Sequence, residues 1–190
     1  MIVPPLCARC GTPTVWPVSR CRECAGRRLS FATARAAVEY DDAVRRLVGG
    51  WKERGLRRLA GEAAALVVDA VERPDVVALT FVPPDGDRRL TRGHHPAEQL
   101  ARELGRRWGL PVEPLLARDR SSSRRQRGLG LVERRRNVRG AFRATGSCPR
   151  QACLVDDVYT SGATANAAAL ALRKAGARRV EVVCFARVVR

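Results

Sequence analysis

Apolar residues in this chain gather in short runs, and the segments between the runs carry apolar residues at a spacing of three or four positions. The runs cover residues 75–82, 112–116, 152–155 and 180–188. Runs of this length are typical of buried strands, whereas the wider spacing is typical of amphipathic helices. Strands that alternate with helices predict an α/β fold with a mostly parallel sheet flanked by helices.

The first helical pattern covers residues 31–48, and we expect that helix to end at Gly49 and Gly50. A second helix is expected over residues 56–71. Lys52 falls between the two helices, where a lone lysine is usually exposed.

Two later helices have clear end signals. Pro96 suits the first position of a helix that runs to Trp108. An alanine-rich helix is expected from Thr164 to Lys174, with Gly176 as its C-cap.

The run at 152–155 leads into adjacent carboxylates, Asp156 and Asp157, and then into a turn rich in hydroxyls and small residues. That turn ends with Thr160, Ser161, Gly162, Ala163 and Thr164. A strand, a small polar turn and a helix N-terminus together form an anion site, because backbone N–H groups and the helix dipole both favour negative charge. The alternative is a simple helix cap beside solvated carboxylates. The combination favours a sugar phosphate, and neither common nucleotide-binding glycine motif is present.

The N-terminal segment contains two CxxC pairs separated by ten residues, Cys7 with Cys10 and Cys21 with Cys24. This spacing is typical of a four-thiolate Zn²⁺ site with a closed, structural coordination shell. Two disulfides are the alternative, but nothing in the sequence indicates export. We therefore expect a zinc-binding head over residues 1–28, stabilised by its metal, and a second domain over 29–190.

The 190-residue chain has a net charge of +17, with 36 Lys and Arg against 19 Asp and Glu. This surplus indicates an anionic partner, either a polyphosphate ligand or nucleic acid, although a solvated basic surface is the alternative. Residues 118–143 hold ten arginines against Asp119 and Glu133. We expect a flexible basic loop over about 118–132, suited to closing over a pyrophosphate but too poor in aromatics to stack bases.

A second basic loop follows the first strand and contains Arg88, Arg89 and Arg92. If the strands are parallel, this loop and the acidic loop open at the same edge of the sheet, where the arginines could hold a diphosphate. His94 and His95 are interpreted as part of an exposed loop.

No run of 18 apolar residues and no signal-peptide pattern is present. The sequence therefore predicts a cytoplasmic protein without membrane insertion. No pattern indicates an oligomeric state.

The loop from Asp156 to Thr164 closely resembles the phosphoribosyl pyrophosphate (PRPP) motif of type I phosphoribosyltransferases. The resemblance implies that Asp156 and Asp157 contact the ribose hydroxyls and that the turn at 160–164 surrounds the 5′-phosphate. Ser161 stands where many members have threonine, which keeps the hydroxyl.

Three further segments resemble the ComF family, phosphoribosyltransferase-like proteins linked to competence and DNA uptake. These segments are the CxxC pairs, residues 81–93 and residues 126–142, and Tyr40 and Lys52 also match. The chain departs from the family at His94-His95-Pro96, where many members have Phe-Asn-Gln or Phe-Asp-His.

The resemblance implies PRPP binding by Lys52, Arg88 and Arg89 together with the acidic loop, and Mg²⁺ bound with the PRPP. In an enzyme, Asp156 and Asp157 would hold the ribose and Arg92 would help to neutralise the leaving pyrophosphate. A binding protein would instead handle single-stranded DNA during uptake. A third hypothesis is an adaptor that docks a DNA-uptake helicase or channel protein.

Overall fold

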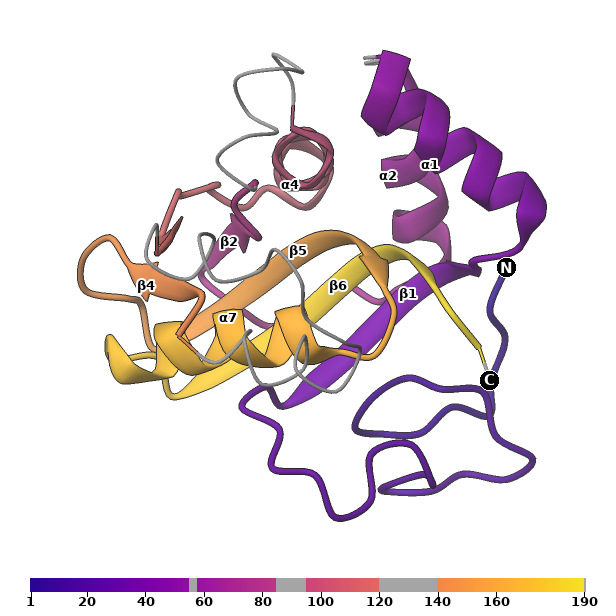
Figure 1. Cartoon of the computed structure of the whole chain (residues 1–190), viewed down its shortest axis with the longest axis horizontal. Helices are drawn as coiled ribbons and strands as arrows, with labels where there is room; N and C mark the ends of the chain where they lie inside the picture. Colours follow the sequence, from indigo (N-terminus) through magenta and orange to yellow (C-terminus); the bar gives the residue numbers. More distant parts are fainter. Residues whose placement is uncertain (55–57, 85–94, 120–139, 190) are drawn as a thin grey trace, which may run out of the picture.

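The computed structural model describes residues 1–54, 58–84, 95–119 and 140–189. At its centre is a four-stranded sheet in the order β1-β6-β5-β2, in which every neighbouring pair is parallel (Figure 1). The strands are β1 (Thr33–Glu39), β6 (Arg179–Arg187), β5 (Gln151–Tyr159) and β2 (Ala78–Phe81). The predicted α/β class with a parallel sheet flanked by helices is confirmed.

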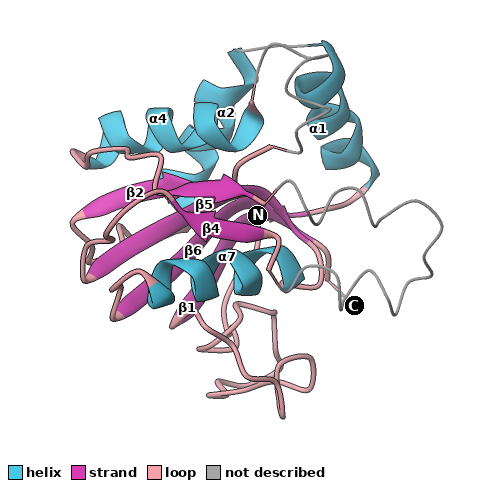
Figure 2. Cartoon of the chain, turned by 60° about the vertical axis from the view of Figure 1, so that its left-hand side comes forward, coloured by secondary structure: helices cyan, strands magenta, loops and turns pink. Residues whose placement is uncertain are grey.

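Helices cover both faces of this sheet. The helices α1 (Asp42–Arg54), α2 (Arg58–Ala70) and α4 (Pro96–Trp108) lie over one face, and α7 (Ala163–Lys174) lies over the other (Figure 2). The strands supply apolar side chains to both layers: Leu154 packs in the cluster that includes α7, and Val155 packs in the cluster with α4. Burial on both faces explains why the strands are apolar runs rather than alternating patterns. An antiparallel pair, β3 (Leu116–Arg118) and β4 (Phe142–Ala144), lies on the α7 side.

The helix predicted over residues 31–48 is wrong in its first half. Residues 33–39 form β1, which pairs with β6 over its length, and α1 begins only at Asp42. The alanines of this segment favour a helix in isolation. Pairing with β6 satisfies the backbone hydrogen bonds and buries Ala34 and Ala37, so tertiary contacts override the local preference.

The predicted helix end at Gly49 and Gly50 is also wrong, because α1 continues to Arg54. Each glycine inside a helix costs about 1 kcal/mol relative to alanine. Trp51 offsets this cost: it is fully buried, its ring meets Phe185 edge-on at 6.5 Å, and its indole N–H donates to Gln99 Oε1 at 2.8 Å. Lys52 therefore lies within α1 rather than between two helices.

The remaining boundaries differ by smaller amounts. Helix α4 begins at Pro96 and ends at Trp108 as predicted, and the Nδ1 atom of His95 caps it by accepting a hydrogen bond from the backbone N–H of Glu98 at 3.3 Å. The strand expected at 112–116 is formed only at its two ends, by a bridge between Val112 and Leu79 and by Leu116, which begins β3. In the described part of the chain, no helix is long and apolar enough to cross a membrane.

The N-terminal segment lies along the outer edge of β1 (Figure 1). The backbone N–H of Ile2 donates to Ala37 O at 2.8 Å, and the N–H of Ala34 donates to Arg9 O at 2.9 Å. These bonds cover an edge strand that would otherwise present unpaired backbone groups. The domain boundary after residue 28 remains a prediction.

We predict that Gly49→Ala raises the free energy of unfolding by about 0.5–1 kcal/mol, because alanine restricts the unfolded chain and favours the helix. Gly49 has no positive φ, and, apart from its chain neighbours and the backbone of its own helix, no described atom lies within 4 Å of the position its Cβ would occupy. Chemical denaturation would measure the change.

Gly109→Ala is the matched control, because Gly109 caps α4 with a φ of 65°. That change should lower stability by about 1 kcal/mol. A loss of stability in Gly49→Ala would contradict the continuous helix.

Candidate metal centre and phosphate-binding loop

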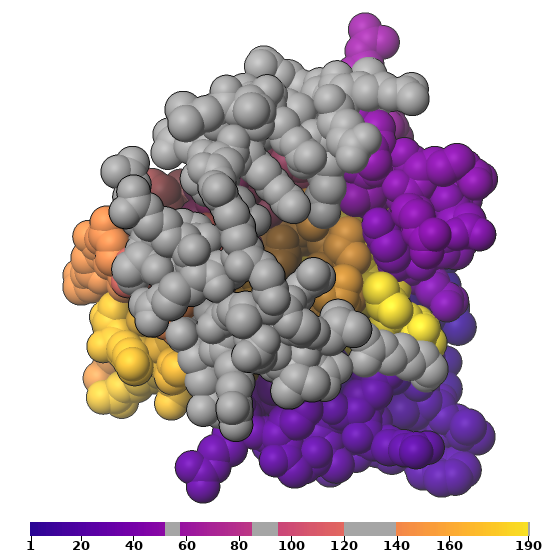
Figure 3. All heavy atoms as spheres, in the orientation of Figure 1, coloured from indigo at the N-terminus to yellow at the C-terminus, as the bar shows by residue number. Residues whose placement is uncertain are grey.

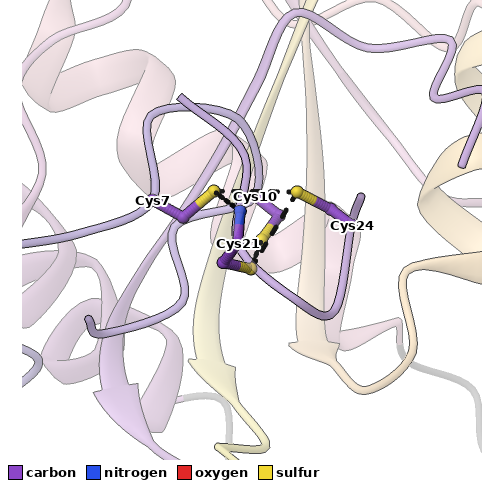
Figure 4. Close-up of side chains that lie close together, drawn as sticks. All are labelled: Cys7, Cys10, Cys21 and Cys24. Atoms are coloured by element: carbon purple, nitrogen blue, oxygen red, sulfur yellow. Dashed lines mark hydrogen bonds between the residues drawn. The ribbon is translucent and has the colours of Figure 1, made fainter. Parts of the chain in front are cut away.

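Four buried cysteines in the N-terminal segment point toward one another (Figure 4). Their Sγ atoms all lie within 4.8 Å of one another, with 3.4 Å between Cys10 and Cys21 and 3.7 Å between Cys7 and Cys24. Four thiolates around a tetrahedral zinc ion would be roughly 3.8 Å apart, given a Zn–S distance of about 2.3 Å. The arrangement therefore fits a bound metal ion. No pair forms the disulfide of the alternative interpretation.

Tight backbone turns bring the thiols together. The N–H of Gly11 donates to Cys7 O at 2.9 Å, the N–H of Ala25 donates to Cys21 O at 2.9 Å, and the N–H of Cys21 donates to Cys7 Sγ at 3.2 Å. Burial raises the pKa of the Cys7 thiol, but hydrogen bonds from neighbouring backbone N–H groups outweigh this and lower it to about 7. Burial raises the pKa of Cys24 to about 12. Cys7 therefore ionises to a thiolate more readily than Cys24.

The predicted acidic pair lies near the carboxyl end of β5. Strand β5 continues to Tyr159, so Asp156 and Asp157 are inside the strand rather than just beyond it. The Asp156 carboxylate accepts a hydrogen bond from the backbone N–H of Asp157 at 2.9 Å. Burial raises the pKa of the Cys184 thiol on β6, and the charges of Asp156 and Asp157 raise it further. In the register of the sheet, Asp156 lies opposite Cys184 of β6.

The turn that follows β5 leads directly into α7. Gly162 is the N-cap of α7 and has a left-handed backbone with a φ of 71°. A Cβ atom there would lie 2.2 Å from the Tyr159 hydroxyl oxygen, so only glycine fits. A glycine cannot cap the first N–H groups through a side chain, and the first turn of α7 has no acidic residue. This helix end therefore retains its positive partial charge.

The structure brings together only part of the predicted site. Asp156, Asp157 and residues 160–164 form one continuous strand–turn–helix unit, and part of this orange region is visible at the surface beside α1 (Figure 3). Arg88, Arg89 and Arg92 lie outside the described residues, as does most of the basic segment predicted at 118–132. The backbone of Lys52 is in α1, and its side chain is not described.

Because β2 and β5 are parallel neighbours, their carboxyl ends lie at the same edge of the sheet, where both predicted loops begin. The N–H of Val82, one residue beyond β2, donates to Val155 O at 3.0 Å. At the same edge, the Nε of Arg118 donates to Pro83 O at 3.1 Å, and its guanidinium lies 4.9 Å from the Phe142 ring centroid.

Two residues beside the loop were missed by sequence reasoning. Tyr159 is buried at the last position of β5, and Arg187 is buried opposite it on β6. Burial, and then the nearby Cys10 thiol, raise the pKa of the Tyr159 hydroxyl above its ordinary range. The available signal was Arg187 itself, the one charged residue in the apolar run from Val182 to Val189.

We predict that Cys10→Ser releases the metal ion from the purified full-length chain and lowers its melting temperature, because a hydroxyl is a much weaker ligand than a thiolate. Elemental analysis of the protein would measure one ion per wild-type chain if the four thiols bind one metal. Cys148→Ser removes a buried thiol outside the cluster and should keep the ion. Equal metal content in both variants would contradict the site.

Comparison with known proteins gives near full-length relatives, although no protein-family model matches the chain. Competence protein F of Haemophilus influenzae is 28% identical over 96% of this chain and 85% of its own length. DNA utilization protein YhgH of Salmonella typhimurium is 26% identical over 97% and 85%, respectively. Competence protein ComFC of Streptococcus pneumoniae is 25% identical over 96% and 76%.

Two solved structures show partial likeness. Glutamine PRPP amidotransferase from B. subtilis, complexed with ADP and GMP, aligns with 66% of this chain and 26% of its own at 22% identity and a TM-score of 0.45. The protein TT1426 from Thermus thermophilus aligns with 70% of this chain and 83% of its own at 20% identity and a TM-score of 0.36. Over nearly its whole length, this chain is therefore a distant relative of competence protein F, competence protein ComFC and the DNA utilization proteins, at 25–28% identity.

Proposed function

We propose that this protein binds PRPP at the loop from Asp156 to Thr164 and that it acts in DNA uptake. One observation carries the proposal: two carboxylates at the end of β5 are followed, within one short turn, by a left-handed Gly162 that opens α7 without a side-chain cap. A phosphorylated sugar needs both kinds of group close together, hydrogen-bond acceptors for its hydroxyls and N–H donors for its phosphate.

The two ends of the loop take different parts of this ligand. Asp156 and Asp157 accept hydrogen bonds from the ribose hydroxyls. The backbone N–H groups at the start of α7, with the hydroxyls of Thr160, Ser161 and Thr164, donate to the 5′-phosphate. Ser161 Oγ already lies 3.4 Å from the N–H of Ala163, which is a weak contact that a phosphate oxygen can replace.

The pyrophosphate group of PRPP requires positive charge. Arg88, Arg89 and Arg92 follow β2, whose carboxyl end is next to that of β5, and Lys52 is in the helix that follows β1. Mg²⁺ is the expected cation, because it prefers oxygen ligands and binds readily through carboxylates and phosphates. The net charge of +17 is consistent with a polyanionic ligand.

Phosphoribosyl transfer is the reaction that such a site would perform. An acceptor would attack C1 of the ribose as the C1–O bond to pyrophosphate breaks, with Asp156 and Asp157 holding the sugar and Arg92 stabilising the leaving group. Pyrophosphate release with a panel of nucleobases would distinguish turnover from binding alone.

We propose Zn²⁺ as the metal of the four-cysteine centre. Four thiolates in a tetrahedral arrangement form the usual ligand set of structural zinc, and oxygen-seeking cations such as Mg²⁺ bind thiolates poorly. The buried thiols leave no open coordination position, so the ion would be structural rather than catalytic.

A surface hollow on the head favours a second function, binding of single-stranded DNA. Trp16 is 66% exposed and lines this hollow together with Arg20 and Arg22, which are both exposed. Exposed aromatics stack on unpaired bases, and adjacent arginines contact the phosphates. Residues 1–28 carry five arginines against one acidic residue, Glu23, which gives the head the charge that this ligand needs.

For PRPP binding, we predict that Asp156→Asn and Asp157→Asn each weaken affinity by roughly 10–150-fold, since a hydrogen bond to a charged group contributes about 1.5–3 kcal/mol. Isothermal calorimetry with PRPP and Mg²⁺ would measure the loss. The double variant Asp69→Asn/Asp75→Asn changes charge only outside the loop and should bind normally. Unchanged affinity in the Asp156 and Asp157 variants would refute the assignment.

For DNA binding, we predict that Trp16→Ala weakens affinity for a thymidine oligonucleotide by roughly 5–150-fold, because stacking contributes about 1–3 kcal/mol per base. Arg20→Ala should reduce the slope of log affinity against log salt by about 1. Fluorescence anisotropy across a salt series would measure both. Arg102→Ala, an exposed arginine on α4, is the control and should leave affinity and slope unchanged. Normal binding by Trp16→Ala would exclude the hollow as the DNA site.

A further inference from the structure

Arg187 is a charged side chain in an unusual place, the interior of the molecule. Only 1% of its surface is exposed, and it lies at the end of β6, paired in register with Tyr159 of β5 and Glu39 of β1. Burying a guanidinium is costly unless it is paired and hydrogen-bonded. Its contacts therefore show what the position requires.

On one side, Arg187 binds the cysteine head. Its Nη1 donates to the carbonyl oxygen of Cys10 at 2.5 Å, and its Nη2 donates to Thr12 Oγ1 at 2.6 Å. The same Nη2 lies 3.4 Å from a carboxylate oxygen of Glu23. Thr12 Oγ1 is in turn 3.2 Å from Cys10 Sγ. Arg187 thus contacts a predicted metal ligand directly through its backbone and indirectly through Thr12.

On the other side, Arg187 contacts the proposed phosphate-binding loop, which is the loop from Asp156 to Thr164. Its guanidinium carbon lies 5.1 Å from the centroid of the Tyr159 ring, which is cation–π distance. The Tyr159 hydroxyl lies against Gly162, where a Cβ atom would be 2.2 Å away. The position of the Tyr159 ring therefore sets how closely the turn can approach β5, and Arg187 holds that ring.

A second set of contacts, independent of Arg187, also joins the head to this loop. The segment that joins the head to β1 binds the first turn of α7, where Asn166 Oδ1 accepts from the N–H of Ser30 at 2.6 Å. The next residue, Phe31, meets the Tyr159 ring edge-on with 6.4 Å between centroids. The head and its connection thus touch both ends of the turn, Tyr159 on one side and α7 on the other.

Stability alone does not explain this arrangement. Two atoms around this side chain, Arg187 Nε and Glu23 Oε1, are buried and have no hydrogen-bond partner among the described residues. A buried ion pair with unsatisfied groups is often no more stable than apolar residues of the same volume. An apolar side chain cannot donate to Cys10 O and Thr12 while it also stacks on Tyr159. The contacts that only arginine makes are those that join the head to the loop.

We propose that Arg187 is a positioning residue that couples the cysteine head to the phosphate-binding loop, so that a change in the head alters the affinity of the loop for a phosphorylated sugar. This inference rests on the proposed PRPP binding. The head would then regulate the loop. A movement of Thr12 or Cys10 would displace Arg187, and Arg187 would in turn move Tyr159 and Gly162.

The test uses the whole chain and two variants, one of which removes a single contact of Arg187 and the other its guanidinium group. Thr12→Val removes one bond to Arg187 while keeping the arginine, and Arg187→Lys removes the planar group that reaches both sides. Each variant is first checked for wild-type metal content. We expect both to weaken PRPP binding by about fivefold or more, a typical coupling between sites. We also expect faster amide hydrogen exchange in residues 159–166, and no further loss when the two changes are combined.

A matched control separates positioning from general destabilisation. Val67→Ala removes volume from the cluster on the α2 face, outside the head and the loop. It should lower the melting temperature while leaving PRPP affinity and exchange in residues 159–166 unchanged. Equal effects of Val67→Ala and Thr12→Val would overturn the proposal.

The outcomes distinguish this inference from the proposed function. If the wild type binds PRPP and both variants bind it within twofold, the coupling is refuted and the PRPP site stands. If the wild type does not bind PRPP, the proposed function fails, and unchanged amide exchange in the variants then refutes the coupling as well. Additive losses in the double variant would also refute a shared route through Arg187. Should Arg187→Lys fail to fold, Thr12→Val decides the question.

Discussion

The parallel pairing of β6 with both β1 and β5 is the constraint on which the rest of the structure depends. It fixes β1 as an edge strand, and the N-terminal head covers that edge through bonds to Ala34 and Ala37. It also aligns Arg187 with Tyr159 across the ladder. One strand therefore brings a cysteine cluster from the start of the chain next to a turn that lies some 150 residues later in the sequence.

Negative and positive charge lie close together at the edge of the sheet formed by the carboxyl ends of the strands. The acidic pair on β5 increases negative charge there, and burial together with those charges raises the pKa of Cys184. The N-terminus of α7, whose N-cap residue Gly162 has no side chain, supplies positive partial charge a few residues away. A ligand with both hydroxyls and a phosphate complements both charges, because the hydroxyls donate to the carboxylates and the phosphate faces the helix N-terminus. A simple anion or a simple cation complements only one of them.

Much of this site can be predicted from the sequence, because its parts are close together in the chain. The acidic pair, the small polar turn and the alanine-rich helix are predicted in order, and α7 begins within one residue of the expected position. The cysteine cluster can be predicted equally well, since the spacing of its residues reflects the local geometry of two tight turns. By contrast, the sequence predicts a helix where β1 lies, because the alanines there favour a helix locally, and only β6 supplies the backbone partners that make the segment a strand.

The sequence by itself determined the α/β class, the four thiols of the head and the residues of the proposed phosphate-binding loop, because each is encoded by neighbouring residues with strong local preferences. Only the tertiary structure decided that α1 continues through Gly49 and Gly50, since that depends on the burial of Trp51 against Phe185 and its bond to Gln99. Only the tertiary structure, too, placed Arg187 between Thr12 and Tyr159. Local propensity carries no information about such contacts, because they join residues that approach one another only when the sheet forms.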